Sequence, residues 1–245
     1  MARQMPRGPF VLSAEIDWSN VADRHRHPFD LPALEALGEL DLRSPVTFFV
    51  GGNGTGKSTL IEAIATHQGV NPEGGSDQMH FGTVDRSVSE LHEHLRVARG
   101  PRPSTRYFLR AESFFNVATA VDDYGATDSY GDISLHELSH GESFLALVHH
   151  RFTPGGWYCL DEPEAALSVR GLLELLVLVH EHVQTGSQFV IATHSPILMA
   201  YPGATIYEFS DGGVERVAWD DVDTVGITRS FLDAPNRFLQ QLGIA

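Results

Sequence analysis

A glycine-rich segment, from Gly51 to Ser58, has the spacing G-x-x-x-x-G-K-[ST] of a phosphate-binding loop. Glycines leave room for backbone N–H groups to surround phosphate oxygens, and they tolerate the positive φ angles that such a loop needs. Lys57 can reach the β- and γ-phosphates of a nucleotide, and the hydroxyl of Ser58 can bind Mg²⁺. We therefore expect phosphate contacts from Gly51, Asn53, Gly54, Thr55, Gly56, Lys57, Ser58 and Thr59.

Two adjacent carboxylates, Asp161 and Glu162, follow the apolar residues 157–160. The first is placed to coordinate Mg²⁺. The second can polarise a water molecule for attack on a γ-phosphate. A strand that simply ends in a polar turn is the alternative, but two neighbouring acids are unusual after so apolar a segment.

A histidine, His194, follows a second apolar segment, residues 188–192. In open α/β sheets, ligand groups gather outside the carboxyl ends of the strands. Lys57, Asp161 and His194 each follow a predicted strand, so we expect them to converge on one ligand. A histidine on its own would more often be structural.

Ser139 and Gly141 precede the apolar residues 144–148, which we expect to be helical. Serine is a preferred N-cap, and the N–H groups at a helix N-terminus attract anions. A well-capped helix that binds no ligand is the alternative interpretation.

The apolar pattern predicts the elements that must position these side chains, and strands that alternate with helices indicate an α/β fold. A helix over 88–99 is expected to end at Gly100-Pro101. The predicted strands are 46–50, 106–110, 157–160 and 188–192, with an edge strand in 9–18 and a hairpin in 204–219; the other predicted helices are 60–65, 165–182 and 229–242, the last interrupted at Pro235.

The chain has 245 residues, of which 32 are acidic and 17 basic, and a net charge of −15. A protein that follows nucleic-acid phosphates by bulk electrostatics would normally carry the opposite sign. The net charge therefore makes a nucleic-acid partner less favoured without excluding it, because a local basic patch can oppose the total charge.

One cysteine, Cys159, excludes an internal disulfide and suits a reducing cytosol. No apolar run is long enough to predict a transmembrane helix, so we expect a cytoplasmic protein.

Four motifs, in the order in which they occur along the chain, resemble those of the ATP-binding cassette (ABC) ATPases. The resemblance covers roughly residues 40–210. The segment 51–58 resembles Walker A. Its Asn53 matches the form G-x-N-G-x-G-K-S, which is common in the SMC, Rad50 and RecF-type branch of the family. Residues 138–142 are similar to the L-S-G-G-Q signature, and residues 157–162 to Walker B with its catalytic glutamate. The histidine at 194 matches the switch histidine. Residues 161–164 resemble the D-E-P-E of small predicted bacterial ATPases.

The resemblance implies a P-loop NTPase fold with a mostly parallel central sheet, flanking helices and a reduced helical insert lobe. A single domain would span 1–245, with the insert and signature over about 111–150 and a hairpin and C-terminal helix over about 204–242. The implied ligands are ATP and Mg²⁺. The implied site residues are Glu162, His194 and Lys57 for catalysis and Ser58 and Asp161 for the metal.

The resemblance also implies an ATP-dependent homodimer, assembled head to tail. In the family, the signature helix of one subunit covers the γ-phosphate that Walker A of the other subunit binds. This assigns Ser139 and Gly141 to the nucleotide of the second copy.

Two departures from the family pattern affect this interpretation. The family usually has a glutamine after the second core strand, where it senses the metal and the attacking water; here Glu112 occupies the plausible position and is a candidate magnesium ligand. A helix cap is the alternative role for Glu112. The usual S-A-L-D segment after Walker B is replaced by residues 165–168, Ala-Ala-Leu-Ser, so the aspartate that contacts the second subunit is absent.

The favoured function is an ATPase whose nucleotide-driven dimerisation acts on an unknown partner. A slow ATP-dependent switch that acts through a partner protein or nucleic acid, in repair or defence, is the second hypothesis. The energising subunit of a membrane transporter is the third, and it is less favoured because the segment 111–134 is short where a transporter ATPase would contact its membrane partner.

Overall fold

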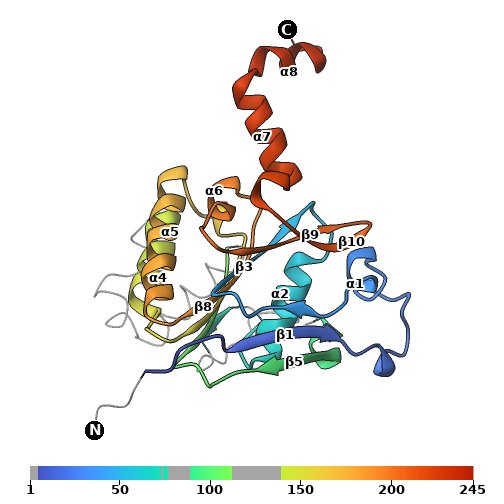
Figure 1. Cartoon of the computed structure of the whole chain (residues 1–245), viewed down its shortest axis with the longest axis vertical. Helices are drawn as coiled ribbons and strands as arrows, with labels where there is room; N and C mark the ends of the chain where they lie inside the picture. The colour runs from blue at the N-terminus through green and yellow to red at the C-terminus, as the bar shows by residue number, and fades with distance from the viewer. Residues whose placement is uncertain (1–4, 73, 77–88, 112–138, 245) are drawn as a thin grey trace.

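The computed structural model describes residues 5–72, 74–76, 89–111 and 139–244 (Figure 1). The main sheet consists of β3 (Val46–Gly51), β4 (Gly75–Ser76), β6 (Arg106–Arg110), β7 (Trp157–Asp161), β8 (Gln188–Ala192), β9 (Thr205–Ser210) and β10 (Gly213–Val217). Their order is β10-β9-β3-β8-β7-β6-β4. Strands β9, β3, β8, β7 and β6 run parallel, whereas β10 and β4 pair antiparallel at the two edges. The expected α/β class and mostly parallel sheet are confirmed.

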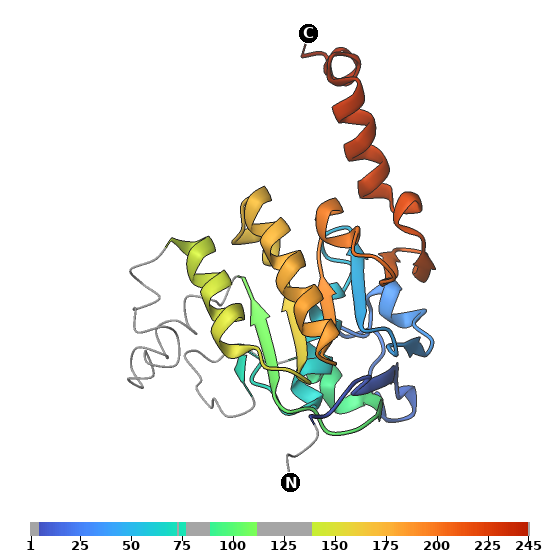
Figure 2. The same cartoon turned by 60° about the vertical axis from the view of Figure 1, so that its left-hand side comes forward.

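Layers of helix cover both faces of this sheet (Figures 1 and 2). One face packs against α4 (His140–Arg151), α5 (Val169–Gln184) and α6 (Pro196–Met199). The other face packs against α2 (Lys57–His67) and α1 (Pro32–Glu35). Because helices cover both sides, each residue of β7 and β8 is buried, which explains why these strands are apolar without alternation.

A smaller antiparallel sheet lies beyond α2. It contains the strand predicted in 9–18, but that strand pairs on both sides and is therefore central, so the expectation of an edge strand is wrong. The sheet consists of β1 (Val11–Ile16), β2 (Leu40–Asp41) and β5 (Leu95–Arg99), in the order β2-β1-β5. The buried amide of Gln188 joins the two sheets: its Oε1 accepts hydrogen bonds from the backbone N–H groups of Phe10 and Val11, at 2.8 and 2.9 Å. This small sheet and the main sheet enclose α2 between them.

The helix predicted over 88–99 is wrong. Its first part is a 3₁₀ helix, Glu90–His94, which Ser89 caps by accepting a hydrogen bond from the N–H of Leu91. Its second part is strand β5, which pairs along the length of β1. Pairing with a strand 80 residues away overrides the local helical pattern, because a ladder of backbone hydrogen bonds outweighs weak propensities.

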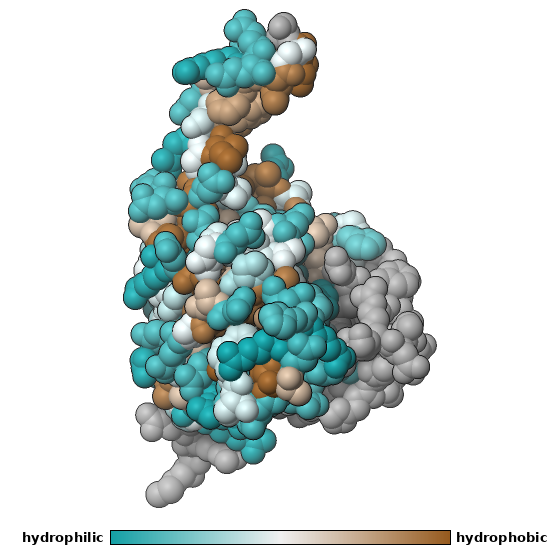
Figure 3. Space-filling model, turned by 90° about the vertical axis from the view of Figure 1, so that its right-hand side faces the viewer, coloured by the Kyte–Doolittle hydropathy of each residue, from teal (hydrophilic) through white to brown (hydrophobic). Residues whose placement is uncertain are grey.

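The C-terminal region forms two helices that extend away from the body (Figures 1 and 2). They are α7 (Asp223–Asp233) and α8 (Pro235–Gln241), so the predicted interruption at Pro235 is confirmed, although α7 begins six residues earlier than the predicted helix. Apolar side chains lie exposed on this arm (Figure 3), among them Ile227, Leu232 and Leu242. In the described part of the chain, no helix is long and apolar enough to cross a membrane.

Candidate nucleotide site

The phosphate loop joins the end of β3 to the start of α2, as its motif predicts. Three of its glycines have positive φ angles: 129° at Gly51, 77° at Gly54 and 98° at Gly56. A side chain at Gly51 would also collide with the backbone oxygen of Phe209 on β9. Glycine is therefore required by both conformation and packing, and the loop is left open for an anion.

Lys57 lies at the first turn of α2, and its ammonium group turns back over the loop. Its Nζ donates hydrogen bonds to the carbonyl oxygens of Gly51, at 2.8 Å, and Gly52, at 2.7 Å. Burial lowers the pKa of Lys57, and the nearby carboxylates of Glu162 and Asp161 oppose that shift. A phosphate in the loop would offer this buried cation a stronger, charged acceptor than two carbonyl groups.

Asp161 is the most deeply buried acid of the site, with 4 % of its side chain exposed. The Ser58 hydroxyl donates to its Oδ1 at 2.9 Å, and the Arg110 Nε donates to its Oδ2 at 2.9 Å. Burial raises the pKa of Asp161, while the charge and hydrogen bond of Arg110 and the hydrogen bond of Ser58 lower it. The predicted pair of magnesium ligands, Ser58 and Asp161, is thus in direct contact.

Arg110 is a residue of the candidate site that the sequence analysis missed. It ends β6, and the parallel register places it beside Asp161 on β7. Its guanidinium also pairs with Glu62 of α2, at 2.9 Å, so one cation connects two strands and the helix that follows the phosphate loop. The contact between Arg110 and Asp161 follows from the register in which β6 and β7 pair. The amino-acid sequence of neither strand specifies that register.

Glu162 adopts a left-handed backbone conformation, with a φ of 49°. Non-glycine residues rarely adopt such angles, and a strained residue at the end of a strand is often functional. Its N–H donates to the carbonyl of Ala192 at 2.9 Å, which fixes the turn against β8. The side chain is 37 % exposed, and its Oε1 lies 3.5 Å from Nε2 of His194.

His194 is placed beside the two acids, as the sequence predicts. Its Nε2 is buried and has no hydrogen-bond partner in the described structure. Glu164, which the sequence analysis noted only within the D-E-P-E segment, fixes this region: its carboxylate accepts hydrogen bonds from the Thr193 hydroxyl, at 2.8 Å, and from the backbone N–H of His194. The ring Nε2 makes no hydrogen bond in the described structure and lies 3.5 Å from the Glu162 carboxylate, a position that suits contact with a phosphate oxygen.

The described signature residues, 139–142, lie at the N-terminus of α4, and they make no hydrogen bond or ion pair with the phosphate loop of the same chain in the described structure. Ser139 is the N-cap of α4 in a capping box: its hydroxyl donates to Oε2 of Glu142 at 2.5 Å, and its backbone N–H donates to the same oxygen at 3.0 Å. These bonds lower the pKa of Glu142. Gly141 packs closely under the backbone of Ala166, where an added Cβ would lie 3.2 Å from the carbonyl oxygen.

The structure therefore brings together most of the residues that the sequence assigned to the nucleotide. Lys57, Ser58, Asp161, Glu162 and His194 meet at the carboxyl ends of β3, β7 and β8. The open glycine loop and the unpartnered His194 nitrogen fit a nucleotide's phosphates, and the adjacent Ser58 and Asp161 oxygens fit Mg²⁺. Glu112 lies outside the described residues.

A cavity of about 330 Å³ adjoins the phosphate loop on the side of Ser58 and Thr59. Arg110 and Glu62 line its inner wall, and Arg26, His27 and Glu90 come from the segments around the small sheet. Arg26 and Glu90 form an ion pair across its rim, at 2.9 Å. The metal side of the site is therefore hollow and bordered by charged groups.

Comparisons with known proteins agree with these motifs. A family described as "AAA domain, putative AbiEii toxin, Type IV TA system" matches residues 126–200, and a family described as "AAA domain" matches residues 35–85. The cytochrome c biogenesis ATP-binding export protein CcmA of Salmonella typhi is 27 % identical over 163 residues, which cover 63 % of this chain and 76 % of that protein. The CcmA protein of Rhodopseudomonas palustris is 29 % identical over 185 residues, 71 % of this chain and 88 % of that protein.

The fold is also found among solved structures. A metal-chelate type ABC transporter in an inward-facing conformation aligns with a TM-score of 0.50 over 91 % of this chain and 89 % of that chain, at 14 % identity. The chain thus has a P-loop fold, and its family matches and relatives make it similar to ATP-binding proteins of the ABC ATPase type.

Proposed function

We propose that this chain hydrolyses ATP with Mg²⁺ and that two copies enclose the nucleotides head to tail. The observation that carries the proposal is the convergence of Lys57, the Ser58–Asp161 pair and Glu162 at one edge of the sheet. An ammonium group, a hydroxyl–carboxylate pair and a free carboxylate are the groups that phosphoryl transfer to water uses.

Each of these side chains has a distinct role in the proposal. Lys57 would exchange its two carbonyl partners for the β- and γ-phosphates. Ser58 and Asp161 would hold Mg²⁺, which neutralises charge on the phosphates when it is bound. Arg110 keeps Asp161 oriented, since it occupies the carboxylate oxygen that does not face Ser58.

Glu162 and His194 act on the attacking water and the γ-phosphate. The Glu162 side chain is 37 % exposed, and among the described residues its ion-pair partner is the His194 ring, so its carboxylate is available to orient a water molecule and to accept its proton. The Nε2 of His194 would contact a γ-phosphate oxygen, which supplies the partner that this nitrogen lacks. The two groups lie 3.5 Å apart, so both can reach the same bound phosphate and water.

The signature helix supports the dimer. Ser139 and the start of α4 are exposed and make no hydrogen bond with the phosphate loop of their own chain among the described residues. The exposed N-terminus of this 12-residue helix is suited to an anion, and in the proposed dimer Ser139 and Gly141 face the nucleotide of the other copy.

The test uses the variant Glu162→Gln, which keeps the size of the side chain and removes the general base. We expect ATP turnover to fall on the order of 10²- to 10⁴-fold, while ATP binding persists. Since ATP that binds the closed dimer more tightly than the monomer drives association, light scattering should show a monomer without nucleotide and a dimer with Mg-ATP.

Ser139→Arg provides the matched test of the interface. It should leave ATP binding to the monomer intact and prevent the Glu162→Gln dimer, because bulk and charge would occupy the nucleotide-facing end of α4. A Glu162→Gln protein that binds Mg-ATP and stays monomeric would contradict the dimer. Undiminished turnover in Glu162→Gln would contradict the catalytic role.

Glu112 is proposed as an additional magnesium ligand, on its position just after β6. A carboxylate there should bind Mg²⁺ more firmly than the glutamine usual in the family. Glu112→Gln should then raise the Mg²⁺ concentration for half-maximal turnover without changing the melting temperature. If Glu112 instead caps a helix, the melting temperature should fall and the Mg²⁺ requirement should stay constant.

A second candidate function, the ATPase subunit of a transporter, is favoured by the similarity to the CcmA export proteins. It predicts that the chain co-purifies with an integral membrane protein. The third candidate, a slow switch that acts on nucleic acid, predicts that DNA stimulates turnover. With a net charge of −15, weak and salt-sensitive DNA binding is expected.

A further inference from the structure

Large apolar side chains are exposed on two surfaces of the chain. Nine are exposed among the described residues, and eight of these lie on α5 or on the C-terminal arm, residues 223–244. Those on α5 are Val169, Leu173 and Val177, and those on the arm are Ile227, Phe231, Leu232, Leu242 and Ile244. Exposed apolar residues on a monomer are normally scattered singly, whereas a concentration of them marks an interaction site.

The three exposed residues of α5 form one stripe along the helix. Val169, Leu173 and Val177 follow one another at intervals of four residues, so they lie on the same face, here called the α5 stripe. Another face of α5 packs into the core through Leu172 and Leu175. Because α5 begins soon after the carboxyl end of β7, the stripe starts near the edge of the sheet that carries the candidate nucleotide site.

The arm is a helical surface with a firm base. The rings of Phe231 on α7 and Phe238 on α8 meet edge to face, with centroids 5.8 Å apart, and join the two helices. At the base, Val225 is buried in the core, and the Trp219 Nε1 donates to the carbonyl oxygen of Pro196 at 3.0 Å. Apolar side chains gather on the inner side of the bend of the arm (Figure 3). The arm therefore offers an ordered apolar surface to another element.

Both surfaces lie toward the side on which the second copy is proposed to pack. The arm extends beyond the N-terminal end of α5, as Figures 1 and 2 show, and that end marks the carboxyl edge of the sheet. The candidate nucleotide site lies at this edge, and the base of the arm contacts Pro196, two residues after His194. A second copy that covers the nucleotides therefore comes within reach of the arm.

The exposed apolar area suits an interface between two copies. A large apolar side chain that is about half exposed leaves on the order of 100 Å² in water, so the eight side chains leave on the order of 800 Å². A stable protein–protein interface covers about 800 Å² per partner. The arm or the stripe alone supplies only part of that area. In a two-fold pair, the arm of each copy can cover the stripe of the other, and both surfaces are then buried.

The charge of the arm also favours a second copy as the partner. Its side chains include two aspartates and two arginines, so residues 223–244 are neutral within a chain of net charge −15. A neutral surface can approach an equally acidic copy without the repulsion that the total charge would cause. A helix that binds an anionic membrane surface is instead rich in lysine and arginine on its polar face, and the arm contains no lysine.

We propose that the arm of each copy docks on the α5 stripe of the other copy in the nucleotide-bound dimer. This inference rests on the proposed function, because it needs the head-to-tail dimer. The contact adds apolar burial to the closed dimer, and it therefore lowers the protein concentration at which Mg-ATP closes that dimer.

The test is a crosslink between two separately purified full-length variants, each in the Glu162→Gln background. One carries Leu232→Cys on the arm, and the other carries Leu173→Cys on the α5 stripe. The native Cys159 is buried, so each variant presents one accessible thiol. When the two are mixed with a short bismaleimide, Mg-ATP should raise the yield of the crosslinked pair about 10-fold or more over the mixture without nucleotide.

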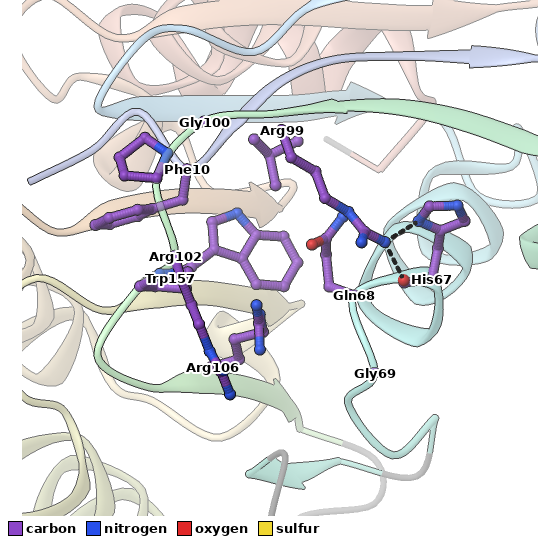
Figure 4. Close-up of a pocket in the computed structure, with 12 residues that line it drawn as sticks. Phe10, His67, Gln68, Gly69, Arg99, Gly100, Arg102, Arg106 and Trp157 are labelled. Atoms are coloured by element: carbon purple, nitrogen blue, oxygen red, sulfur yellow. Dashed lines mark hydrogen bonds between the residues drawn. The ribbon is translucent and has the colours of Figure 1, made fainter. Parts of the chain in front are cut away.

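Arg102→Cys in place of Leu173→Cys is the matched control. Arg102 is also exposed, but it lies at the amino ends of the strands, where it lines a cavity of about 490 Å³ with Arg99, here called the arginine cavity (Figure 4). It should give no crosslink with Leu232→Cys. Equal yields for the two positions would overturn the proposal, because random collisions would then account for the crosslink. A double variant Leu232→Cys/Leu173→Cys that crosslinks only within one copy would also overturn it.

Polar substitutions measure what the contact contributes to association. In the same background, Leu232→Ser/Leu242→Ser should raise the protein concentration for half-maximal dimerisation with Mg-ATP about 10-fold or more, with an unchanged melting temperature of the monomer. Leu173→Ser/Val177→Ser should do the same. The two pairs combined should add little, since either pair alone removes the contact, and full additivity would overturn the proposal. Met5→Ser, at the exposed apolar residue outside both surfaces, should have no effect.

The outcomes distinguish the arm contact from the proposed ATPase activity. Unchanged dimerisation by Mg-ATP in the arm variant would overturn the contact and leave the ATPase intact. A chain that binds Mg-ATP and stays monomeric would overturn both the contact and the proposed dimer. Loss of binding to phosphatidylglycerol vesicles in the arm variant, with dimerisation unchanged, would assign the arm to a membrane and overturn the contact with a second copy.

Discussion

The carboxyl ends and the amino ends of the parallel strands form two regions of the main sheet, here called the carboxyl edge and the amino edge, which differ in how their arginines are paired. At the carboxyl edge, Arg110 pairs with two carboxylates, Asp161 and Glu62, and all three are at least 84 % buried. At the amino edge, Arg99 and Arg102 are exposed, and no carboxylate is among the described residues that line their cavity. The sheet therefore has a buried, compensated ionic cluster at one end and exposed arginines at the other.

This difference determines how a substitution affects folding stability. A buried ion is costly unless it is paired, so the removal of one member of a buried cluster leaves its partners uncompensated. An exposed arginine is solvated whether or not it is paired, and its removal changes folding stability little. Mutations of the buried cluster at the carboxyl edge should thus alter both stability and nucleotide binding, whereas those of the exposed arginines at the amino edge should leave stability nearly unchanged.

Arg110→Met should have the largest effect on stability. It leaves Asp161 and Glu62 buried without their cation, and we expect the free energy of unfolding to fall by about 3–5 kcal/mol. Arg110→Lys should lower the free energy of unfolding by less, because it keeps the positive charge. Some loss remains, since lysine lacks the forked guanidinium that reaches both carboxylates. Urea denaturation monitored by circular dichroism measures both.

To compare the two edges, Arg102→Gln is measured in the same denaturation series. The Arg102 side chain is exposed, so this substitution should alter the free energy of unfolding by less than about 0.5 kcal/mol. Equal losses for Arg110→Met and Arg102→Gln would refute the distinction between the two edges.

Lys57→Ala should have the next largest effect, on ligand affinity. We expect ATP binding to weaken by about 2–3 kcal/mol, because a charge-assisted contact with the phosphates is lost. Hydrolysis should be abolished. Calorimetry with Mg-ATP measures the first effect, and an unchanged dissociation constant would remove Lys57 from the site.

Lys57 is the only lysine in the chain, which permits a second measurement on the unmutated protein. An amine-selective reagent modifies only this side chain and the N-terminus. Mg-ATP should protect Lys57 from modification and leave the N-terminus reactive, as mass spectrometry of the peptides would record.

Ser139→Ala should have a smaller effect than Arg110→Met or Lys57→Ala. Loss of the N-cap should cost about 1 kcal/mol of stability near neutral pH. The pKa of Glu142 is lowered from 4.5 by its bonds to Ser139, so the stability from this pair is present above that pH and is lost as the pH falls through the lowered pKa. The difference in melting temperature between wild type and Ser139→Ala should therefore shrink in acid, and a constant difference from pH 7 to pH 3 would count against the capping box.

The sequence by itself determined the class of the protein and most of the candidate nucleotide site. The phosphate-loop motif, the paired acids and His194 each follow an apolar segment, and parallel strands bring their carboxyl ends to one edge. The buried strands were recognisable because helices cover both faces of the sheet, which makes the strands continuously apolar. Local patterns suffice where chemistry and spacing are confined to a few adjacent residues.

Only the tertiary structure decided the features that depend on register and on distant pairing. Arg110 meets Asp161 because β6 and β7 pair in one particular register, and Glu62 completes the cluster from a helix 48 residues earlier. Residues 95–99 became a strand because β1 offers an edge to pair with, against a local pattern that favoured a helix. The arginine cavity forms where four segments meet, and no short stretch of sequence encodes the space between them.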